Sequence, residues 1–143
     1  MTTRRRLAAL AAAFGLLASG WLHASANAGQ AAERPVWTAP RSAIARVNPL
    51  ARSADVEAGG AKLFRHRCAQ CHRADGTGTS FGPGLTGHRV QSQSDGALFW
   101  KITSGNTRTG MPTFSGLPEL QRWQLVLHLR ALGSSHSTRP IRP

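Results

Sequence analysis

The sequence predicts an all-α domain of three to four helices joined by long loops. Three stretches place apolar side chains at the three- and four-residue spacing of an amphipathic helix, and each begins at a residue suited to a helix start. No segment alternates apolar and polar residues as a half-buried strand does. At 143 residues the chain has room for one domain.

Residues 1–28 have the layout of a secretory signal peptide. Three arginines at positions 4–6 precede an apolar run from Leu7 to about Ala18, and small residues at positions 24, 26 and 28 fit a cleavage site. A membrane-spanning helix is the alternative, but it needs roughly 20 apolar residues, more than this run supplies. We therefore expect cleavage near residue 28 and a periplasmic location.

Basic residues outnumber acidic ones. The full chain has 18 Lys and Arg, six Asp and Glu, and a formal charge of +12. Removal of residues 1–28 takes away three arginines and no acid, which leaves +9. The cations are dispersed and no motif of stacked aromatics accompanies them, so nucleic acid is not an expected partner. An acidic patch on a partner protein, or an anionic membrane surface, is favoured instead.

The segment 29–52 is rich in Ala, Arg and Pro and has no sustained period, which indicates an extended lead-in. Trp37 and the Asn48–Leu50 step are its candidates for contact with the domain that follows. We place that domain at residues 53–134 and a C-terminal tail at residues 135–143.

The three helices of the domain are delimited by capping residues. The first two helices each begin at a serine followed by acidic residues, which favour a helix N-terminus. The third has a proline at its start, which is tolerated in the first turn of a helix. A glycine-rich connection of about 20 residues, 74–93, separates the first two helices, and a loop of this length in a small domain indicates a function. We expect the helices to begin near Ser53, Ser94 and Leu117 and to end at Cys68, Gly105 and Gly133.

The two cysteines of the chain, Cys68 and Cys71, stand in the pentapeptide CAQCH, with His72 directly after them. A disulfide would close a two-residue loop and so remove little chain entropy. A thioredoxin-like dithiol needs a βαβ setting, and a zinc site needs about four ligands; neither is visible. Covalent haem fits best, because two cysteines one turn apart reach both vinyl groups of a porphyrin while the histidine reaches its iron.

Met111 is the one methionine left once residues 1–28 are removed, and it follows His72 by 39 positions. Methionine usually fills gaps in a core. A single methionine between Gly110 and Pro112, in a connection between two helices, is instead a candidate for the second axial ligand of the iron.

These residues, with Gly82-Pro83-Gly84-Leu85, resemble the class I monohaem c-type cytochromes of the bacterial periplasm over about residues 53–133. The resemblance implies a small cytochrome c fold, three to four helices and long loops wrapped around one haem c. It also implies that Cys68 and Cys71 bind the haem covalently and that His72 and Met111 are the iron ligands.

The resemblance assigns further roles around the haem. The backbone carbonyl of Pro83 should accept the Nδ1–H of His72, which leaves Nε2 for the iron. Trp100 or Arg108 is expected to bind the haem propionates. The first and last helices should cross where Gly60 faces an aromatic residue, although His128 stands at a position where the family usually carries an aromatic.

The resemblance implies an electron-transfer protein and not an enzyme, either as a free carrier or as the electron-accepting subunit of a dehydrogenase. The chain would carry one electron at a time between a periplasmic dehydrogenase or respiratory complex and an acceptor such as a terminal oxidase. Its partners would be a dehydrogenase, an oxidase or another cytochrome with an acidic docking patch. The alternatives are a haem enzyme or gas sensor with a displaceable distal methionine, and a non-haem thiol oxidoreductase or metal-binding module.

Overall fold

The computed structural model describes residues 37–137, so the predicted signal peptide, residues 29–36 of the predicted lead-in and the last six residues lie outside the described part. Within it the regular structure is helical, with one isolated antiparallel bridge between Asn106 and Met111. No helix among residues 37–137 combines the length and apolar content that crossing a membrane requires. The elements are α1 (Arg41–Ile44), α2 (Ala54–Arg67), α3 (Ala69–His72), α4 (His88–Gln91), α5 (Asp95–Ser104), the 3-10 helix η1 (Thr107–Thr109) and α6 (Glu119–Ser137).

Three long helices, α2, α5 and α6, match the three that the sequence predicts. The predicted N-caps are present, because Ser53 Oγ accepts a hydrogen bond from the Val56 N–H and Ser94 Oγ accepts one from the Ala97 N–H. The single-turn helices α1, α3 and α4 have four residues each, too few for an apolar period to indicate them.

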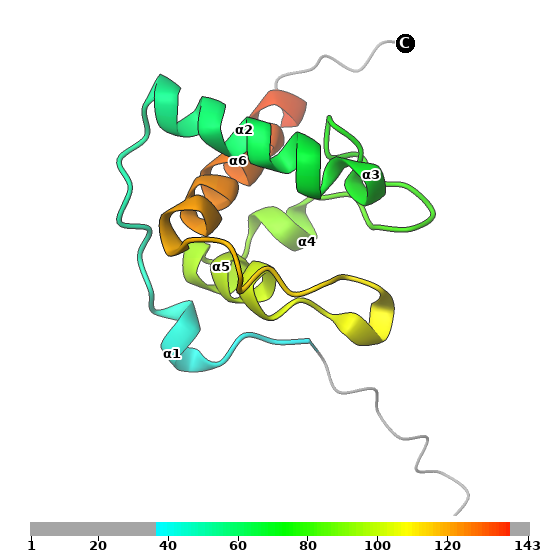
Figure 1. The fold of residues 1–143 in the computed structure, drawn as a ribbon, viewed down its shortest axis with the longest axis horizontal. Helices are drawn as coiled ribbons and strands as arrows, with labels where there is room; N and C mark the ends of the chain where they lie inside the picture. Colours follow the sequence, from blue (N-terminus) through cyan, green and yellow to red (C-terminus); the bar gives the residue numbers. More distant parts are fainter. Residues whose placement is uncertain (1–36, 138–143) are drawn as a thin grey trace, which may run out of the picture. The chain divides into compact units, whose positions relative to one another are not determined.

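Helices α2 and α6 cross in close contact (Figure 1). A Cβ atom on Gly60 would lie 2.3 Å from the backbone oxygen of Gln124, so only glycine permits this approach. One turn later the Phe64 ring packs against the His128 ring, with centroids 5.0 Å apart. The predicted crossing of the first and last helices is therefore confirmed, and His128 fills the aromatic position.

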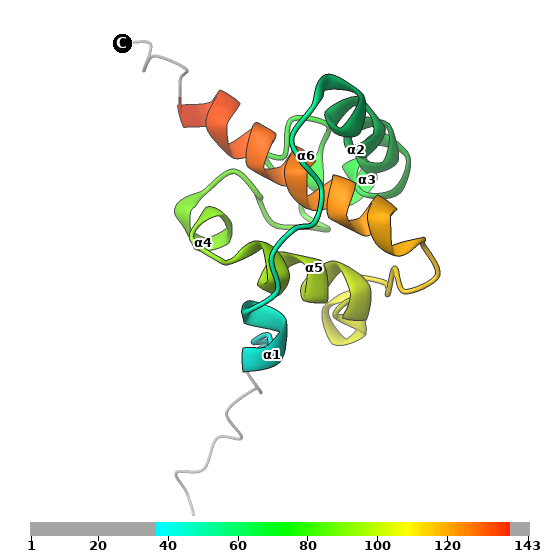
Figure 2. The same cartoon turned by 90° about the vertical axis from the view of Figure 1, so that its left-hand side faces the viewer.

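Helix α5 packs on α6 from the other side (Figure 2). The rings of Phe99 and Trp123 stack with centroids 4.1 Å apart, and the Arg46 guanidinium lies 4.5 Å from the centre of the Phe99 ring. The core around this stack consists of buried apolar side chains from α2, α5 and α6: Phe64, Leu98, Phe99, Ile102, Trp123, Leu125, Val126 and Leu129.

Residues 37–52, which we call the strap, pass along α5 and reach α2 (Figure 1). The sequence predicts an extended segment, whereas the strap contains α1 and packs Ala39 and Ala43 against Ala97 of α5. The expected contact of the Asn48–Leu50 step is confirmed, because Asn48 Nδ2 donates to the Trp123 carbonyl over 3.2 Å. The prediction was wrong only for residues 41–44, because small alanines can be buried without forming an apolar period; the rest of the strap contains no helix.

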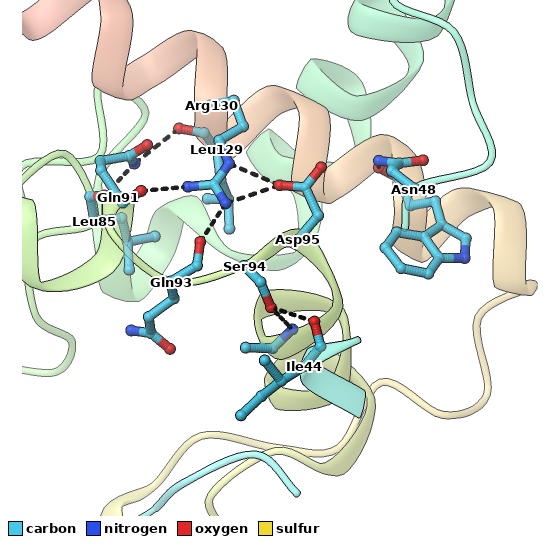
Figure 3. Close-up of polar contacts among 11 residues, drawn as sticks. Ile44, Asn48, Leu85, Gln91, Gln93, Ser94, Asp95, Leu129 and Arg130 are labelled. Atoms are coloured by element: carbon cyan, nitrogen blue, oxygen red, sulfur yellow. Dashed lines mark hydrogen bonds and ion pairs between the residues drawn. The ribbon is translucent and has the colours of Figure 1, made fainter. Parts of the chain in front are cut away.

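An arginine fastens α6 to the segment between α4 and α5 (Figure 3). Arg130 donates to Asp95 Oδ1 over 2.8 Å, to the Gln91 carbonyl over 2.7 Å and to the Gln93 carbonyl. The ion pair also lies at the N-terminus of α5, where an acid is favourable.

The predicted end of α6 was wrong, because the helix continues past Gly133 to Ser137. A Cβ atom at Gly133 would lie 2.4 Å from Cδ of Gln91, whose Nε2 donates to the Leu129 carbonyl. The glycine therefore makes room for a side chain instead of ending a helix. Sequence alone does not distinguish these two uses of glycine.

Candidate functional site

The CAQCH stretch lies where α2 passes into α3. The N–H of Cys68 donates to the Phe64 carbonyl, which extends the helical bonding of α2, and the N–H groups of Cys71 and His72 both donate to the Cys68 carbonyl. The two thiols are free and half-buried. Burial, with a smaller contribution from Cys71, raises the pKa of the Cys68 thiol to about 11. Both sulfurs are thus presented one helical turn apart, with His72 directly after them.

The His72 imidazole is held by a backbone oxygen, as the resemblance implies. Its Nδ1 lies 2.8 Å from the Pro83 carbonyl oxygen, which can only accept, so Nδ1 carries the proton. The loop that supplies this oxygen is anchored in turn, since Thr79 Oγ1 donates to the Cys71 carbonyl over 2.6 Å. The other ring nitrogen, Nε2, is left as a free acceptor for a metal.

Met111 occupies a tight turn between α5 and α6. Its N–H donates to the Asn106 carbonyl and its carbonyl accepts from the Asn106 N–H, with N···O distances of 3.1 and 2.9 Å. Gly110, in the left-handed region at φ 90°, closes the turn. After Met111 the chain is tied back to α5, because the Phe114 N–H donates to the Ile102 carbonyl. The half-buried methionine is therefore fixed by backbone contacts on both sides.

The two segments lie on the same side of the α2–α6 crossing, α3 above and the yellow segment with η1 below (Figure 1). Apolar side chains from both segments contact the core yet stay only partly buried. Among them are Cys68, Leu85 and Phe114. A small domain often needs a cofactor to complete its hydrophobic core. Side chains that such a cofactor would cover are expected to be only partly buried by the polypeptide itself.

The two residues predicted to bind the propionates, Trp100 and Arg108, lie on different helices. Trp100 is on α5 and packs against the cluster of Ala39, Ala43 and Ala97. Arg108 is exposed on η1. Their role is not tested by any contact in the structure and stays a prediction.

Two polar groups that sequence reasoning did not assign lie close together instead. The Trp37 indole is in contact with the Lys101 ammonium, which is 4.8 Å from the ring centre. The indole nitrogen is buried without a hydrogen-bond partner within the described part of the chain. The sequence offered one sign of this contact, a single tryptophan in the Ala-, Arg- and Pro-rich lead-in. Lys101 is 64 positions away, and no local pattern links the two residues.

Residues 37–137 contain no group of three or more His, Cys, Asp or Glu side chains that could hold a metal ion. His72 and Met111 are the predicted iron ligands, and an imidazole with a thioether suits an iron porphyrin, in which the macrocycle would supply the other four ligands.

The comparisons with known proteins agree with this chemistry. A family model described as cytochrome c oxidase, cbb3-type, subunit III matches residues 55–129, which is more than half of the chain. No curated protein matches the sequence significantly. A cytochrome c domain transfers electrons through a haem, and its family binds haem c covalently. The chain belongs to the cbb3-type cytochrome c family, a family of class I monohaem c-type cytochromes with an all-α fold.

Proposed function

We propose that this protein is a periplasmic one-electron carrier with one haem c, attached through Cys68 and Cys71 and ligated by His72 and Met111. The observation that carries the proposal is the hydrogen bond from His72 Nδ1 to the Pro83 carbonyl, directly after two free thiols one turn apart. That bond fixes the tautomer that has Nε2 available for iron, and it raises the basicity of the ligand.

In this proposal, residues of the chain position the haem and its two iron ligands. Cys68 and Cys71 hold the macrocycle, the Pro83 carbonyl orients His72, and the paired backbone bonds of Asn106 hold Met111. When bound, the haem iron supplies a single electron by cycling between the ferrous and ferric states. With His72 and Met111 both bound, the iron would have no position left for a substrate, and the methionine would raise the reduction potential relative to anionic ligands. Both features favour a carrier over an enzyme.

Basic residues next to the CAQCH stretch support docking to acidic partners. Arg65, Arg67 and Arg73 are exposed, and none of them forms an ion pair within residues 37–137. Phe81, in the loop that follows His72, is 81% exposed and offers an apolar contact on that loop. Such a surface gives fast, salt-sensitive and short-lived encounters with a dehydrogenase, an oxidase or another cytochrome. An anionic membrane surface is the other acidic partner that the same charge favours.

The experiment is an absorption spectrum of the exported protein, oxidised and reduced, beside Met111→Ala. The wild type should show the weak red-edge band of methionine bound to ferric iron, and the variant should lose it and bind carbon monoxide once reduced. Thr107→Ala, an exposed change on the same turn, is the control and should keep the band. A wild type that lacks the band and binds carbon monoxide rapidly would instead support a haem enzyme or gas sensor.

A further inference from the structure

The indole N–H of Trp37 is a buried donor without an acceptor. Trp37 Nε1 is the one buried side-chain nitrogen or oxygen in residues 37–137 that has no hydrogen-bond partner. Leaving such a group unpaired costs about 1–3 kcal/mol, and native structures rarely tolerate it without a missing ligand or water. The strap therefore presents an N–H group to an acceptor that the polypeptide does not supply.

One cation lies beside this donor, and the charge of a second acts on the first. Lys101 Nζ is 4.8 Å from the centre of the Trp37 ring, and Lys101 is half-buried. Burial lowers the pKa of Lys101, and the nearby Arg89 guanidinium lowers it further. Neither cation pairs with a carboxylate of the described residues, whose ion pairs are Arg46–Glu119, Arg52–Glu57 and Arg130–Asp95. The mutual repulsion of two like charges is unfavourable unless an anion joins them.

The elements that carry these groups flank the proposed haem site. Arg89 is on α4, at the end of the loop whose Pro83 carbonyl holds His72. Lys101 is on α5, whose last turn is bonded to the segment after Met111. The strap enters below α5 and next to the yellow segment (Figure 1). The donor and the cations therefore come from three segments, two of which adjoin the loops that carry Pro83 and Met111.

We propose that Trp37 Nε1 and Lys101 bind a carboxylate of the haem, one of its two propionates, and that the charge of Arg89 favours its ionised form. The proposal rests on the proposed function, because it needs haem at this site. A propionate accepts the indole N–H and neutralises the Lys101 ammonium. An acidic side chain of a docking protein is the alternative acceptor, and the experiment below uses the haem-bearing chain alone, so a response there belongs to the propionate. The family match begins at residue 55, so the strap adds this contact from outside the matched domain.

The contact has a consequence for electron transfer. A hydrogen bond and two positive charges stabilise the ionised propionate, so its pKa lies below the neutral range. An ionised propionate stabilises ferric iron more than a protonated one does. Where the propionate titrates, the reduction potential falls as pH rises. Trp37 and Lys101 would therefore keep the potential independent of pH near neutrality.

The experiment measures the reduction potential of the haem-bearing full chain across a wide pH range, for Trp37→Phe and Lys101→Gln. Each variant removes one stabilising group, and the phenyl ring retains the packing of the indole. The pH at which the potential begins to change should move upward by about one unit, tenfold in the propionate dissociation constant. Lys101→Gln should also lower the potential at neutral pH, because it removes a positive charge that opposes ferric iron.

Lys62→Gln removes the one other lysine, which is exposed on α2, so it is the matched control and should follow the wild-type pH profile. Trp100→Phe removes the indole N–H that the sequence predicts for the propionates, and so tests that rival assignment. A shift in Trp100→Phe with none in Trp37→Phe would overturn the proposal, as would profiles of Trp37→Phe and Lys101→Gln that superpose on the wild type. Loss of the methionine band in either variant would also contradict it, because the proposal assigns both residues to the propionate and not to the iron.

The two proposals fail in distinguishable ways. A chain that never acquires haem would overturn both of them. A haem-bearing chain with the methionine band, whose pH profile ignores Trp37 and Lys101, would overturn only the propionate site.

Discussion

The contact between α2 and α6 offers the sharpest test of the packing, through two neighbouring glycines. A Cβ atom on Gly60 would lie 2.3 Å from the Gln124 carbonyl oxygen and 2.9 Å from its carbonyl carbon. Both atoms belong to the backbone of α6, which cannot rotate away. On Gly59 the added Cβ would lie 2.9 Å from Gln124 Nε2, the tip of a flexible side chain. The same substitution therefore meets a rigid obstacle at one position and a movable one at the next.

The two effects of Gly60→Ala can be compared in magnitude. Alanine is better than glycine inside a helix by about 1 kcal/mol. Overpacking a close contact costs about 1–3 kcal/mol, and the upper part of that range applies here because α6 must move by about 1 Å to relieve the clash. We expect Gly60→Ala to lower the free energy of unfolding by about 1–2 kcal/mol. Gly59→Ala should leave it unchanged or raise it by up to about 1 kcal/mol, because Gln124 can turn aside.

The assay is thermal and guanidinium unfolding of the haem-bearing protein, in which covalent attachment keeps the haem on both the folded and unfolded chains. At this domain size the Gly60→Ala loss corresponds to a Tm lower by roughly 5–15 °C. Equal stabilities of the two alanine variants, or a Gly60→Ala protein as stable as the wild type, would refute the close crossing.

Three further predictions concern the burial of His128, the hydrogen bonds of Arg130 and the basic residues next to the CAQCH stretch. Burial is the largest cause that lowers the pKa of His128 below its usual 6.5, so the unfolded chain binds more protons and stability should fall as pH drops through about 6.5. His128→Phe should lessen this fall relative to the wild type in unfolding curves taken at several pH values, and parallel losses would contradict the assignment. Arg130→Lys keeps the charge but cannot match the three acceptors, so the free energy of unfolding should decrease by about 1–3 kcal/mol, measured by guanidinium titration. Reduction by an acidic donor protein should slow as ionic strength rises, and more so in the wild type than in an Arg65→Gln, Arg67→Gln double variant; rates indifferent to salt in stopped-flow experiments would argue against basic steering.

Sequence predicted those parts of the fold that depend on local signals. Ser53 and Ser94 were identified as N-caps because capping is decided within three residues, and the structure contains both hydrogen bonds. The glycine-rich loop was expected to serve a function, and its Pro83 carbonyl indeed meets His72. The spacing of CAQCH and the setting of Met111 predicted the candidate ligands for the same reason, since each motif is contained in a few adjacent residues.

Features that depend on distant contacts were missed. Helix α1 is stabilised by the packing of Ala43 on α5. Its four residues are too few to show the apolar periodicity that predicts a helix. From the sequence, Gly133 predicts the end of a helix. In the structure it makes room for the side chain of Gln91, which is 42 positions earlier. The pairing of Trp37 with Lys101 joins the strap to α5, so it could be found only once the chain was folded.

The most direct test of the whole account is the mass of the mature chain produced with a working haem-attachment system. We predict the mass of the polypeptide after signal removal plus one haem, and loss of that addition in a Cys68→Ala, Cys71→Ala double variant. A mature wild-type chain that weighs no more than its polypeptide would contradict the central claim that Cys68 and Cys71 bind the cofactor.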